Sequence, residues 1–583
     1  MNNFLIQNIN NHNQVLANKK VSPSFTAIMT ASNNAAVSPI GTNILEKFLQ
    51  QTAINASTQV APVQQTTTAP VQWKNNLKTM FNNNEATIMG IIIRNFGAKD
   101  IEGDQLLSGK DIKGNFNNAI PRLDELKNLG INTLHLLPLN PPGKLNAKGT
   151  AGSLYAPEDF LKIDPALDDK NDPRTVEEEF KNFVDECHKR GIHVMLDLPS
   201  CASLSLFNQR PDLMAFERNG LPKTPQGWED IRMLSPWLDE EKKQLNPAVL
   251  DMHKKFVDMC QGFGLDGIRA DVARTKPTEF WDIIISYSRA KDPEFAWLAE
   301  SYTYEDASPQ ANMNYDRPED LLKAGFDNYY GQYHIFHEWT KAHEFTDYIK
   351  ENIKMDNQGQ VGKGKSLIGS FGTHDDISLM NNGGANFINL VSGLQATIPM
   401  VNPYYMDGYQ SGDDYKYDFL NKYIPETETD KHDSCVHDGR PDIFNFSRPL
   451  IGKHPEVGTF MKSSLDMRKN YQDIVTKGSF ITLPVKNNPS DQIIAFTRHY
   501  KGRTLLVIAN RDINGRQKAV INVPGLSANS NLQNLLPSYG EESHLQADNN
   551  MVSVDLGAAR VHVFEVNTPN IENSGLEVFR QNI

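Results

Sequence analysis

Cysteine is scarce in this 583-residue sequence, and its four cysteines (Cys187, Cys201, Cys260 and Cys435) are far apart. They form no CxxC pair and no other metal-ligand spacing, which argues against a disulfide framework and a zinc site. No apolar run approaches the roughly 20 residues of a membrane-spanning helix. Residues 1–10 have neither the basic segment nor the apolar core of a secretory signal. We therefore expect a cytoplasmic protein with reduced thiols and no membrane partner.

Positive charge is also in short supply, because 58 basic residues face 71 acidic ones and the formal net charge is −13. Nucleic acids are recognised by basic surfaces, so we expect no nucleic acid partner. A neutral substrate such as a sugar is compatible with this charge. No Gly-rich phosphate-binding fingerprint follows the first predicted strand, which disfavours a dinucleotide-binding fold.

The first part of the chain has little that could form a core. Residues 1–84 are rich in Asn, Gln, Thr, Ala and Ser, and residues 52–71 are the most biased stretch. Such a segment cannot bury enough apolar surface to offset the entropy lost on ordering. We predict that residues 1–84 form a disordered, low-complexity segment.

From residue 85 onward, short apolar runs alternate with segments of helical periodicity. The predicted strands are residues 87–94, 131–139, 192–198, 265–271, 295–299, 366–371 and 397–401, and clear helices cover residues 120–129, 177–190 and 247–262. This alternation predicts a parallel sheet with right-handed crossovers, either open or closed into a barrel. After residue 485 the helical period disappears, so residues 485–567 are predicted to form a C-terminal β-sandwich. Residues 568–583 read as a polar tail.

Two carboxylates stand at the ends of predicted strands, where barrel enzymes build their sites. Within residues 265–271 (LDGIRAD), Arg269 and Asp271 point to the same face, because alternate side chains of a strand share a face. The arginine would keep Asp271 ionised, as a carboxylate nucleophile requires. The alternative is an ion pair that only braces the barrel.

The next predicted strand ends on Glu300, and one helix and two loops fit between it and Asp271. Apolar surroundings would raise the pKa of Glu300 and suit it to donate a proton. The alternative is a structural glutamate at a helix start. A third strand runs into His374 and Asp375, which could equally form a helix-capping turn.

Together these segments resemble the α-amylase superfamily, glycoside hydrolase family 13. GLDGIRAD (264–271) resembles its nucleophile strand, LAES (298–301) its acid strand, and FGTHDD (371–376) the strand that stabilises the transition state. The resemblance implies that Asp271 is the nucleophile, Glu300 the acid/base and Asp375 the third carboxylate. It also implies that Arg269 and His374 support the site.

The resemblance extends to the fold and to substrate-binding residues. The segment GSLY (152–155) resembles the loop whose tyrosine stacks on the sugar, which assigns Tyr155 and, from the first motif, Asp197 to substrate binding. The implied fold is a (β/α)8 barrel over residues 85–484, with a short insertion after the third strand at about residues 199–246. A C-terminal β-domain follows, and no cofactor is expected.

The first motif departs from the family pattern. Its usual Asn and His positions hold Cys201 and Ala202. A thiol is a poor ligand for a hard cation, so we expect no calcium there and no metal site. Similar departures occur in maltosyltransferase-like branches of the superfamily, and residues 140–155 and Lys276-Pro277 point the same way. A hydrolase is almost equally compatible with these features.

The resemblance implies a retaining glycosidase or transglycosylase that acts on α-1,4-glucans through a covalent intermediate on Asp271. The alternative is a glucan-binding or scaffolding protein that keeps the barrel and has lost turnover. Arg274 and Thr275 lie in the loop that leaves the fourth strand, which in the family lines the subsite for the leaving group. We expect them to influence acceptor choice, unless Arg274 simply pairs with an acid such as Glu279.

Overall fold

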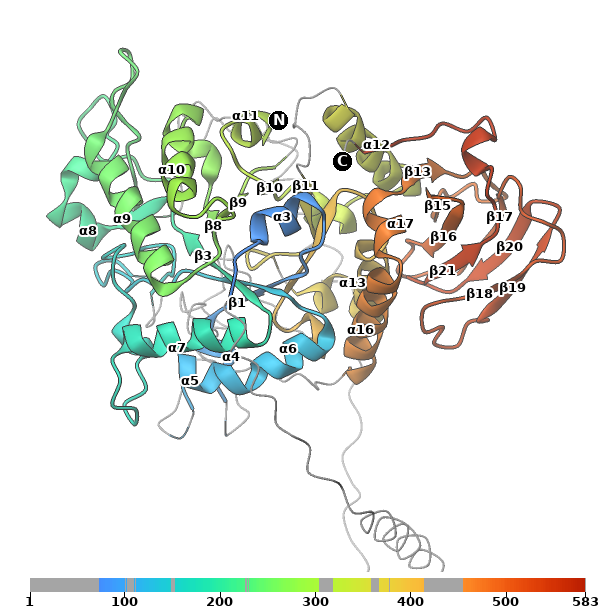
Figure 1. The fold of residues 1–583 in the computed structure, drawn as a ribbon, viewed down its shortest axis with the longest axis horizontal. Helices are drawn as coiled ribbons and strands as arrows, with labels where there is room; N and C mark the ends of the chain where they lie inside the picture. Colours follow the sequence, from blue (N-terminus) through green and yellow to red (C-terminus); the bar gives the residue numbers. More distant parts are fainter. Residues whose placement is uncertain are drawn as a thin grey trace, which may run out of the picture. The chain divides into compact units, whose positions relative to one another are not determined.

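The computed structural model describes residues 73–99, 101, 110, 112–147, 152–225, 228, 230–302, 318–357, 366–376, 378–413 and 454–581. The chain from Trp73 to Ile583 forms one compact unit that combines a closed barrel with a C-terminal sandwich (Figure 1). Residues 1–72, most of the predicted low-complexity segment, lie outside the described residues.

Eight parallel strands close the barrel in the order β1-β12-β11-β10-β9-β8-β3-β2. The strands are β1 (Ile88–Ile91), β2 (Thr133–Leu136), β3 (His193–Leu198), β8 (Gly267–Ala270), β9 (Ala296–Ala299), β10 (Asn328–Tyr329), β11 (Ser366–Ser370) and β12 (Val401–Met406). Closure is made by the pairing of Ile88 with Tyr404. Every residue in these strands is buried, which explains their continuous apolar runs. The predicted (β/α)8 barrel is confirmed.

Helices pack around the barrel and begin and end at residues suited to those positions. They include α4 (Ile93–Phe96), α5 (Phe116–Ala119), α6 (Leu123–Leu129), α7 (Val176–Lys189), α9 (Pro247–Phe263), α10 (Thr278–Lys291), α11 (Pro318–Lys323), α12 (Ala342–Asn357) and α13 (Leu379–Gln395). Thr175 and Glu178 form a capping box at the start of α7. Gly130 and Gly264 end α6 and α9 in the left-handed conformation, with φ of 107° and 85°. Within the described ranges, no helix is long and apolar enough to cross a membrane.

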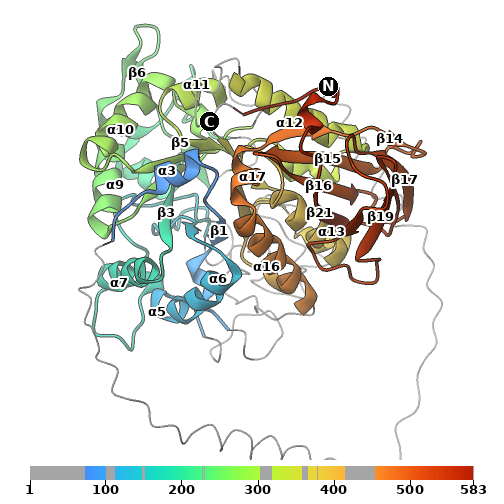
Figure 2. The ribbon, with the colours of Figure 1, turned by 45° about the vertical axis from the view of Figure 1, so that its right-hand side comes forward.

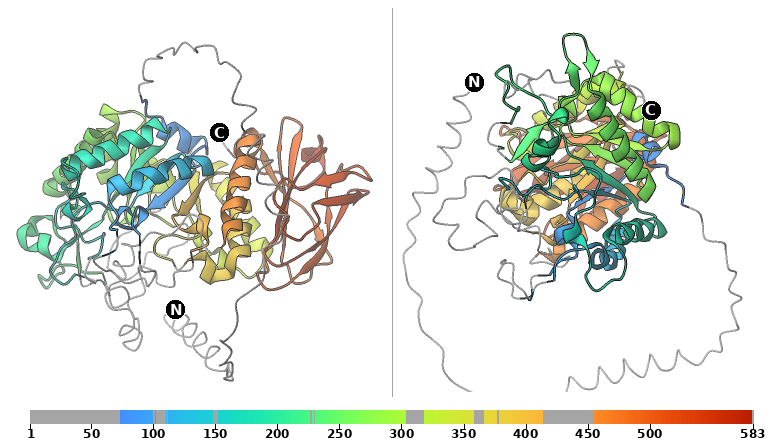
Figure 3. Two further views of the ribbon diagram at one scale, coloured as in Figure 1. Left: turned by 90° about the horizontal axis from the view of Figure 1, so that it is seen from below. Right: turned by 90° about the vertical axis from the view of Figure 1, so that its left-hand side faces the viewer.

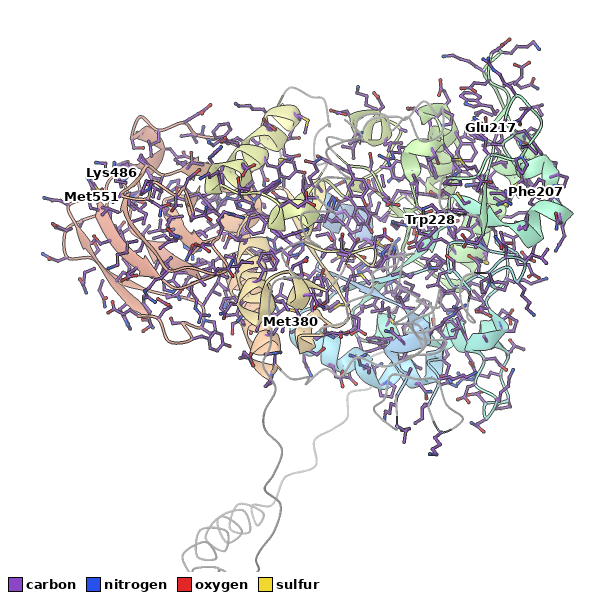
Figure 4. The ribbon with its side chains drawn as sticks, turned by 180° about the vertical axis from the view of Figure 1, so that it is seen from behind. Phe207, Glu217, Trp228, Met380, Lys486 and Met551 are labelled. Carbon is purple, nitrogen blue, oxygen red and sulfur yellow. The ribbon has the colours of Figure 1, made fainter. Side chains whose placement is uncertain are left out.

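The predicted insertion follows β3. It contains β4 (Cys201–Ser203), α8 (Leu204–Gln209), β5 (Ile231–Met233), β6 (Trp237–Asp239) and β7 (Gln244–Leu245). β4 pairs with β5 and β6 with β7, both antiparallel. Figure 4 labels Phe207, Glu217 and Trp228 in this segment, at the opposite end of the view from Lys486 and Met551 of the sandwich.

The C-terminal sandwich has two antiparallel sheets. One contains β13 (Ser479–Thr482), β15 (Ile493–Tyr500), β16 (Arg503–Asn510) and β21 (Val561–Val566), and the other contains β14 (Val485–Lys486), β17 (Gln517–Asn522), β18 (Asn531–Gln533), β19 (His544–Asp548) and β20 (Met551–Leu556). Side chains of both sheets share one core, including Leu506 and Phe564 from the first and Ile521 from the second. The C-terminal all-β domain is therefore confirmed.

This sandwich is larger than the sequence predicted, because its first strand begins at Ser479 and not at residue 485. The end of the chain also belongs to it, since Phe579 is buried and pairs with Phe480. The interpretation of residues 568–583 as a polar tail was wrong for this part. The apolar residues of this segment stand singly among polar ones, so the sequence shows no strand period that would predict the pairing of Phe579 with Phe480.

Two buried arginines link the barrel to the elements that follow it: Arg498 joins the sandwich to the barrel, and Arg468 joins helix α16 (Pro455–Asn470) to it. Arg498 of β15 donates to the carbonyls of Thr397, at 2.9 Å, and Gly478, at 2.8 Å. Arg468 donates to the carbonyl of Val401 at 2.9 Å. α16 and α17 (Gln472–Lys477) lie between barrel and sandwich in Figure 3, and α12 lies beside β15 in Figure 2. Burial lowers the pKa of Arg498 to about 9.

Two barrel strands differ from the sequence prediction. The apolar pattern predicted a strand at residues 397–401, whereas the family resemblance indicated residues 398–408 as the eighth strand. β12 (Val401–Met406) lies within the second range and begins where Val401 pairs with Leu367 of β11. The hydroxyl of Thr397 instead bonds to carbonyls at the end of α13. β10 was not predicted, because its two residues form no apolar run and are defined by pairing with β9 and β11.

The folded unit begins earlier than residue 85. Helix α3 (Leu77–Asn82) buries Leu77 and Phe81 at helical spacing. Before it, the Trp73 ring stacks on His188 at 4.1 Å, and its Nε1 donates to Asp266 at 2.9 Å. The prediction of disorder was therefore wrong for residues 73–84, where scattered apolar residues find partners on the barrel.

Candidate active site

Arg269 is the centre of a cluster of charged side chains at the carboxyl ends of β3, β8 and β9. Its guanidinium is 1% exposed. Nη1 donates to both oxygens of Asp197, at 2.8 and 2.9 Å, and to Oδ1 of Asp271 at 2.9 Å. Nη2 lies 2.8 Å from Oε2 of Glu300. One planar guanidinium therefore holds three carboxylates from three strands in one place.

Asp271 follows directly after β8 and is held on both oxygens. While Oδ1 faces Arg269, Oδ2 accepts hydrogen bonds from the backbone nitrogen and the hydroxyl of Ser200, at 2.9 and 2.8 Å. Burial raises the pKa of Asp271 to about 7, and the positive charge of Arg269 opposes that rise. The carboxyl group is fixed in position and titrates close to neutrality.

Glu300 differs from the sequence expectation. Burial favours its neutral form, but Arg269 and a hydrogen bond from the backbone nitrogen of Val272, at 2.8 Å, outweigh it, so the pKa of Glu300 is lowered. The hydroxyl of Tyr302 donates to Oε1 at 3.2 Å. The expectation of a raised pKa was wrong, because an apolar strand does not reveal a cation at its end.

Val272 carries backbone strain at this point. Its φ is 38° and its ψ is 51°, a left-handed conformation that β-branched residues rarely adopt. Such a conformation costs on the order of 1–3 kcal/mol. This conformation directs the N–H of Val272, the residue after Asp271, toward the carboxylate of Glu300.

Asp197 and Tyr155 form the adjoining wall of the site. The Tyr155 hydroxyl donates to Oδ2 of Asp197 at 2.7 Å, and His135 Nε2 lies 3.2 Å from the same oxygen. Burial favours neutral Asp197, but Arg269 and His135 lower its pKa to about 2. The Tyr155 ring stacks on His374, with ring centroids 5.3 Å apart.

His374 and Asp375 follow β11. Nε2 of His374 lies 3.5 Å from Oδ1 of Asp375, whose side chain is 26% exposed. Burial and the nearby Arg269 lower the pKa of His374 to about 3, so the ring is neutral at physiological pH. Burial and the charge of Glu300 raise the pKa of Asp375 well above its usual range. Both side chains face the cluster around Arg269.

Arg274 and Thr275 lie in a short 3-10 helix, η4 (Ala273–Thr275), immediately after Val272. The Thr275 hydroxyl donates to the Val272 carbonyl at 2.9 Å. Arg274 is partly buried. Both residues therefore stand beside the carboxylate cluster.

Four residues of the cluster were not assigned to the site from the sequence. Ser200 holds Asp271, Tyr302 contacts Glu300, and His135 links Asp197 to the hydroxyl of Tyr404 at 2.8 Å. The fourth, Lys276, is 2% exposed. A sequence signal existed for Ser200 and Tyr302, because each lies within three residues of the end of a barrel strand.

Lys276 places a buried amino group behind Asp271. Its Nζ lies 3.5 Å from the carbonyl oxygen of Ser200, whose N–H and hydroxyl bind Asp271. Burial lowers the pKa of Lys276 to about 8, and the negative charge of Asp271 opposes that change. The amino group is therefore mainly cationic at neutral pH and favours ionised Asp271.

Replacing Lys276 with Met should move the acid-side midpoint of kcat/KM upward by about one pH unit. Loss of the cation disfavours the charged form of Asp271, whose pKa is already raised to about 7. Lys276→Arg keeps the charge and should keep the midpoint near that of the wild type. The measurement is kcat/KM against pH from 5 to 9. An unchanged midpoint in both variants would assign Lys276 a packing role only.

Cys201 and Ala202 occupy β4, beside the site. The Cys201 sulfur lies 3.7 Å from the Ser200 hydroxyl, and burial raises the pKa of the thiol to about 12. A neutral thiol neither attacks an electrophile readily nor binds a hard cation.

The chain is similar in sequence to known enzymes over part of its length. No protein-family profile matches the chain. An α-1,4-glucan:maltose-1-phosphate maltosyltransferase from Rhodospirillum rubrum is 28% identical over 258 residues, which cover 42% of this chain and 35% of that protein. A cyclomaltodextrinase from a Bacillus species is 27% identical over 226 residues, 35% of this chain and 37% of that protein. The matched segments thus span about a third of each relative.

Solved structures share the fold over a longer stretch. A maltogenic α-amylase from Thermotoga neapolitana aligns with a TM-score of 0.60 and 18% identity, covering 83% of this chain and 99% of that one. An α-amylase from Lactobacillus plantarum aligns with a TM-score of 0.58 and 20% identity, with the same coverage. Sequence relatives and fold together confirm the resemblance of this chain to the α-amylase superfamily, with a leaning toward its maltosyltransferases.

Proposed function

We propose that the protein is a retaining enzyme that cleaves and transfers α-1,4-glucosidic bonds, with Asp271 as nucleophile and Glu300 as acid/base. The observation that carries this proposal is the bridge made by Arg269, whose Nη1 contacts Asp271 and whose Nη2 contacts Glu300. One guanidinium can reach both groups only if they are close. Retaining enzymes separate their two carboxyl groups by about 5–5.5 Å, whereas inverting enzymes leave room for a water molecule.

The reaction proceeds by double displacement. A carboxylate oxygen of Asp271 attacks the anomeric carbon, the glycosidic C–O bond breaks, and Glu300 gives its proton to the departing oxygen. Glu300 then takes a proton from water or a sugar hydroxyl, whose oxygen attacks the same carbon and releases Asp271. Asp375 and His374 hydrogen-bond the ring hydroxyls as the sugar distorts, and Tyr155 stacks on the ring.

The electrostatics of the site add one requirement. Asp271 and Glu300 interact and titrate as a pair; burial raises the pKa of Asp271, and Arg269 lowers the pKa of Glu300. Double displacement needs Asp271 ionised and Glu300 protonated. A glycosidic oxygen beside Glu300 is a hydrogen-bond acceptor and favours the protonated acid there.

The substrate class follows from the relatives, which by name act on α-1,4-glucans or cyclomaltodextrins. We assign an α-glucan or maltooligosaccharide as the substrate of this chain, in keeping with its acidic charge. The cytoplasmic location, and the absence of a nucleic acid or membrane partner, belong to the same proposal. Cys201 and Ala202 favour one alternative, a glucan-binding protein without turnover.

The test is incubation with maltoheptaose, with and without maltose as acceptor, and separation of the products by chain length. New chain lengths that depend on maltose indicate transfer, and shorter chains alone indicate hydrolysis. The anomeric configuration of the first product, followed by NMR, should be α if the configuration is retained. A β product, or no turnover by folded protein, contradicts the proposal.

Replacing Arg274 with Ala should raise the ratio of hydrolysis to transfer by about three- to tenfold, while release of the first product changes little. Arg274 lies in η4, beyond the nucleophile, and its planar fork can hold two sugar hydroxyls of an acceptor. A weaker grip lowers the effective concentration of the acceptor but not that of water. An equal fall in both steps assigns Arg274 to support of Asp271.

A further inference from the structure

A second cavity lies where loops of the barrel meet the sandwich. Its volume is about 390 Å³, within the range of small-molecule binding sites. The barrel contributes His337 to Thr340 and Asn382, and the sandwich contributes Gln492 and the segment from Arg511 to Asn514. None of the charged residues around Arg269 lines it.

This cavity opens on the catalytic end of the barrel. Its barrel residues follow the carboxyl ends of β10 and β11, the end on which barrel enzymes carry their sites. The 3-10 helix η6 (Tyr333–His337) connects the two places. His334, in η6, contacts Tyr302 edge-on at 4.9 Å, and Tyr302 in turn bonds to Glu300. His337, at the other end of η6, lines the cavity.

Trp339 supplies an aromatic surface with an unused donor. The ring lines the cavity and is partly exposed, while its other contacts are edge and tilted contacts with Phe336 and Tyr348. Among the described residues its indole N–H has no hydrogen-bond partner, and neither have the side-chain amides of Asn382 and Asn514. An apolar ring face surrounded by neutral donors and acceptors matches the two faces of a sugar.

Two charged residues that line the cavity, Arg511 and Asp512, already have hydrogen-bond partners within the protein. Arg511 donates from Nη1 to Gln492 at 2.8 Å and from Nη2 to the carbonyl of Trp339. Asp512 accepts from the backbone nitrogen of Asn514 at 2.9 Å. A neutral polyol would find the side-chain amides of Asn382 and Asn514 free to bond with it. Nε of Arg511 is buried with no partner in the part of the chain that the structure describes, a donor that a ligand hydroxyl can satisfy.

The site is also held in shape. Arg511, the first residue after β16, donates to the carbonyl of Trp339 and so fixes the backbone of the barrel loop that carries this ring. Gln492 adds a hydrogen bond from Nε2 to the carbonyl of Thr340 at 2.9 Å. A pre-formed site loses little conformational entropy on binding.

We propose that this cavity is a second binding site for a neutral α-glucan chain, separate from the site around Asp271. The choice of an α-glucan rests on the proposed function, while the aromatic and amide chemistry stands by itself. A chain held here lies on the same end of the barrel as the reacting bond. Its role is to retain a polymer near the catalytic centre between turnovers, and short substrates do not need it.

The experiment compares the migration of the full-length protein in native gels with and without glycogen. Trp339→Ala should weaken glycogen binding about tenfold, the loss of about 1.4 kcal/mol. The double variant N382A/N514A should weaken it about threefold. Both should keep kcat/KM for maltotriose within about twofold of the wild type. Phe216→Ala removes another exposed aromatic side chain, from the insertion, and is the matched control.

Trp339 packs against other aromatic rings, so its variant could lose stability, and thermal unfolding is measured alongside. The double variant N382A/N514A changes two partly or fully exposed side chains, so it should remain folded. It tests the proposal even if Trp339→Ala is destabilised. Wild-type retardation of folded Trp339→Ala and of the amide variant overturns the inference. If the wild-type protein turns over maltoheptaose but glycogen does not retard it, the second binding site is contradicted and the proposed function is not. If glycogen retards the wild-type protein but maltoheptaose is not turned over, the proposed function is contradicted and the second binding site is not.

Discussion

Asp271→Asn lowers kcat/KM on maltoheptaose by at least about a thousandfold, because an amide cannot form the glycosyl ester. The substitution also disturbs hydrogen bonding. Asp271 accepts on both oxygens, from Arg269 at one and from Ser200 at the other. Asn offers one acceptor and one donor, so its NH2 group faces a donor whichever way it turns. We expect a small loss of stability beside the complete loss of turnover.

A buried aspartate outside the site separates these two effects. Asp327 accepts from Nη2 of Arg289 at 2.6 Å and from the backbone nitrogen of Trp297 at 2.9 Å. Asp327→Asn should lower the unfolding temperature and retain most of the activity measured well below it. Mass spectrometry of wild-type enzyme with a slow, activated donor should find the glycosyl group on the peptide that contains Asp271. Residual activity above about a tenth in Asp271→Asn contradicts the nucleophile assignment.

The sequence was sufficient to locate the strands that build the site. Long, fully buried strands such as β3 and β8 leave continuous apolar runs, and the carboxyl ends of all barrel strands meet at one end. Asp197, Asp271 and Glu300 could therefore be expected to lie together, as the bonds to Arg269 show they do. β10 was not predicted from the sequence because a strand of two residues is too short to show a hydrophobic period.

Charge balance within the site could not be predicted in the same way. Strand β9 ends on Glu300 with four buried apolar or small residues before it, which by itself favours a protonated acid. The lowered pKa depends on the second arm of Arg269 and on the strained backbone of Val272. Both are products of tertiary contacts between neighbouring strands. The same holds for Lys276, whose burial beside Ser200 no local pattern reveals.

Arg269→Lys should reduce kcat/KM by at least about a hundredfold and lower the unfolding temperature by several degrees. The guanidinium binds Asp197 and Asp271 through Nη1 and Glu300 through Nη2. A lysine offers one ammonium on a shorter reach and cannot contact all three carboxylates. Leaving a buried charge without its partner typically costs about 3–5 kcal/mol.

The position of the nucleophile and the ionisation of the acid should both change in that variant. Without Nη2 of Arg269, burial dominates and the pKa of Glu300 rises, so the alkaline limb of kcat moves to higher pH even as the rate falls. Arg289→Lys is the matched control, because Arg289 binds the buried Asp327 and the carbonyl of Gly325, at 2.6 and 2.8 Å, away from the site. It should lose stability while its pH profile stays that of the wild type. If Arg269→Lys likewise loses stability and keeps the pH profile of the wild type, Arg269 only braces the barrel. That result would contradict its electrostatic role in catalysis.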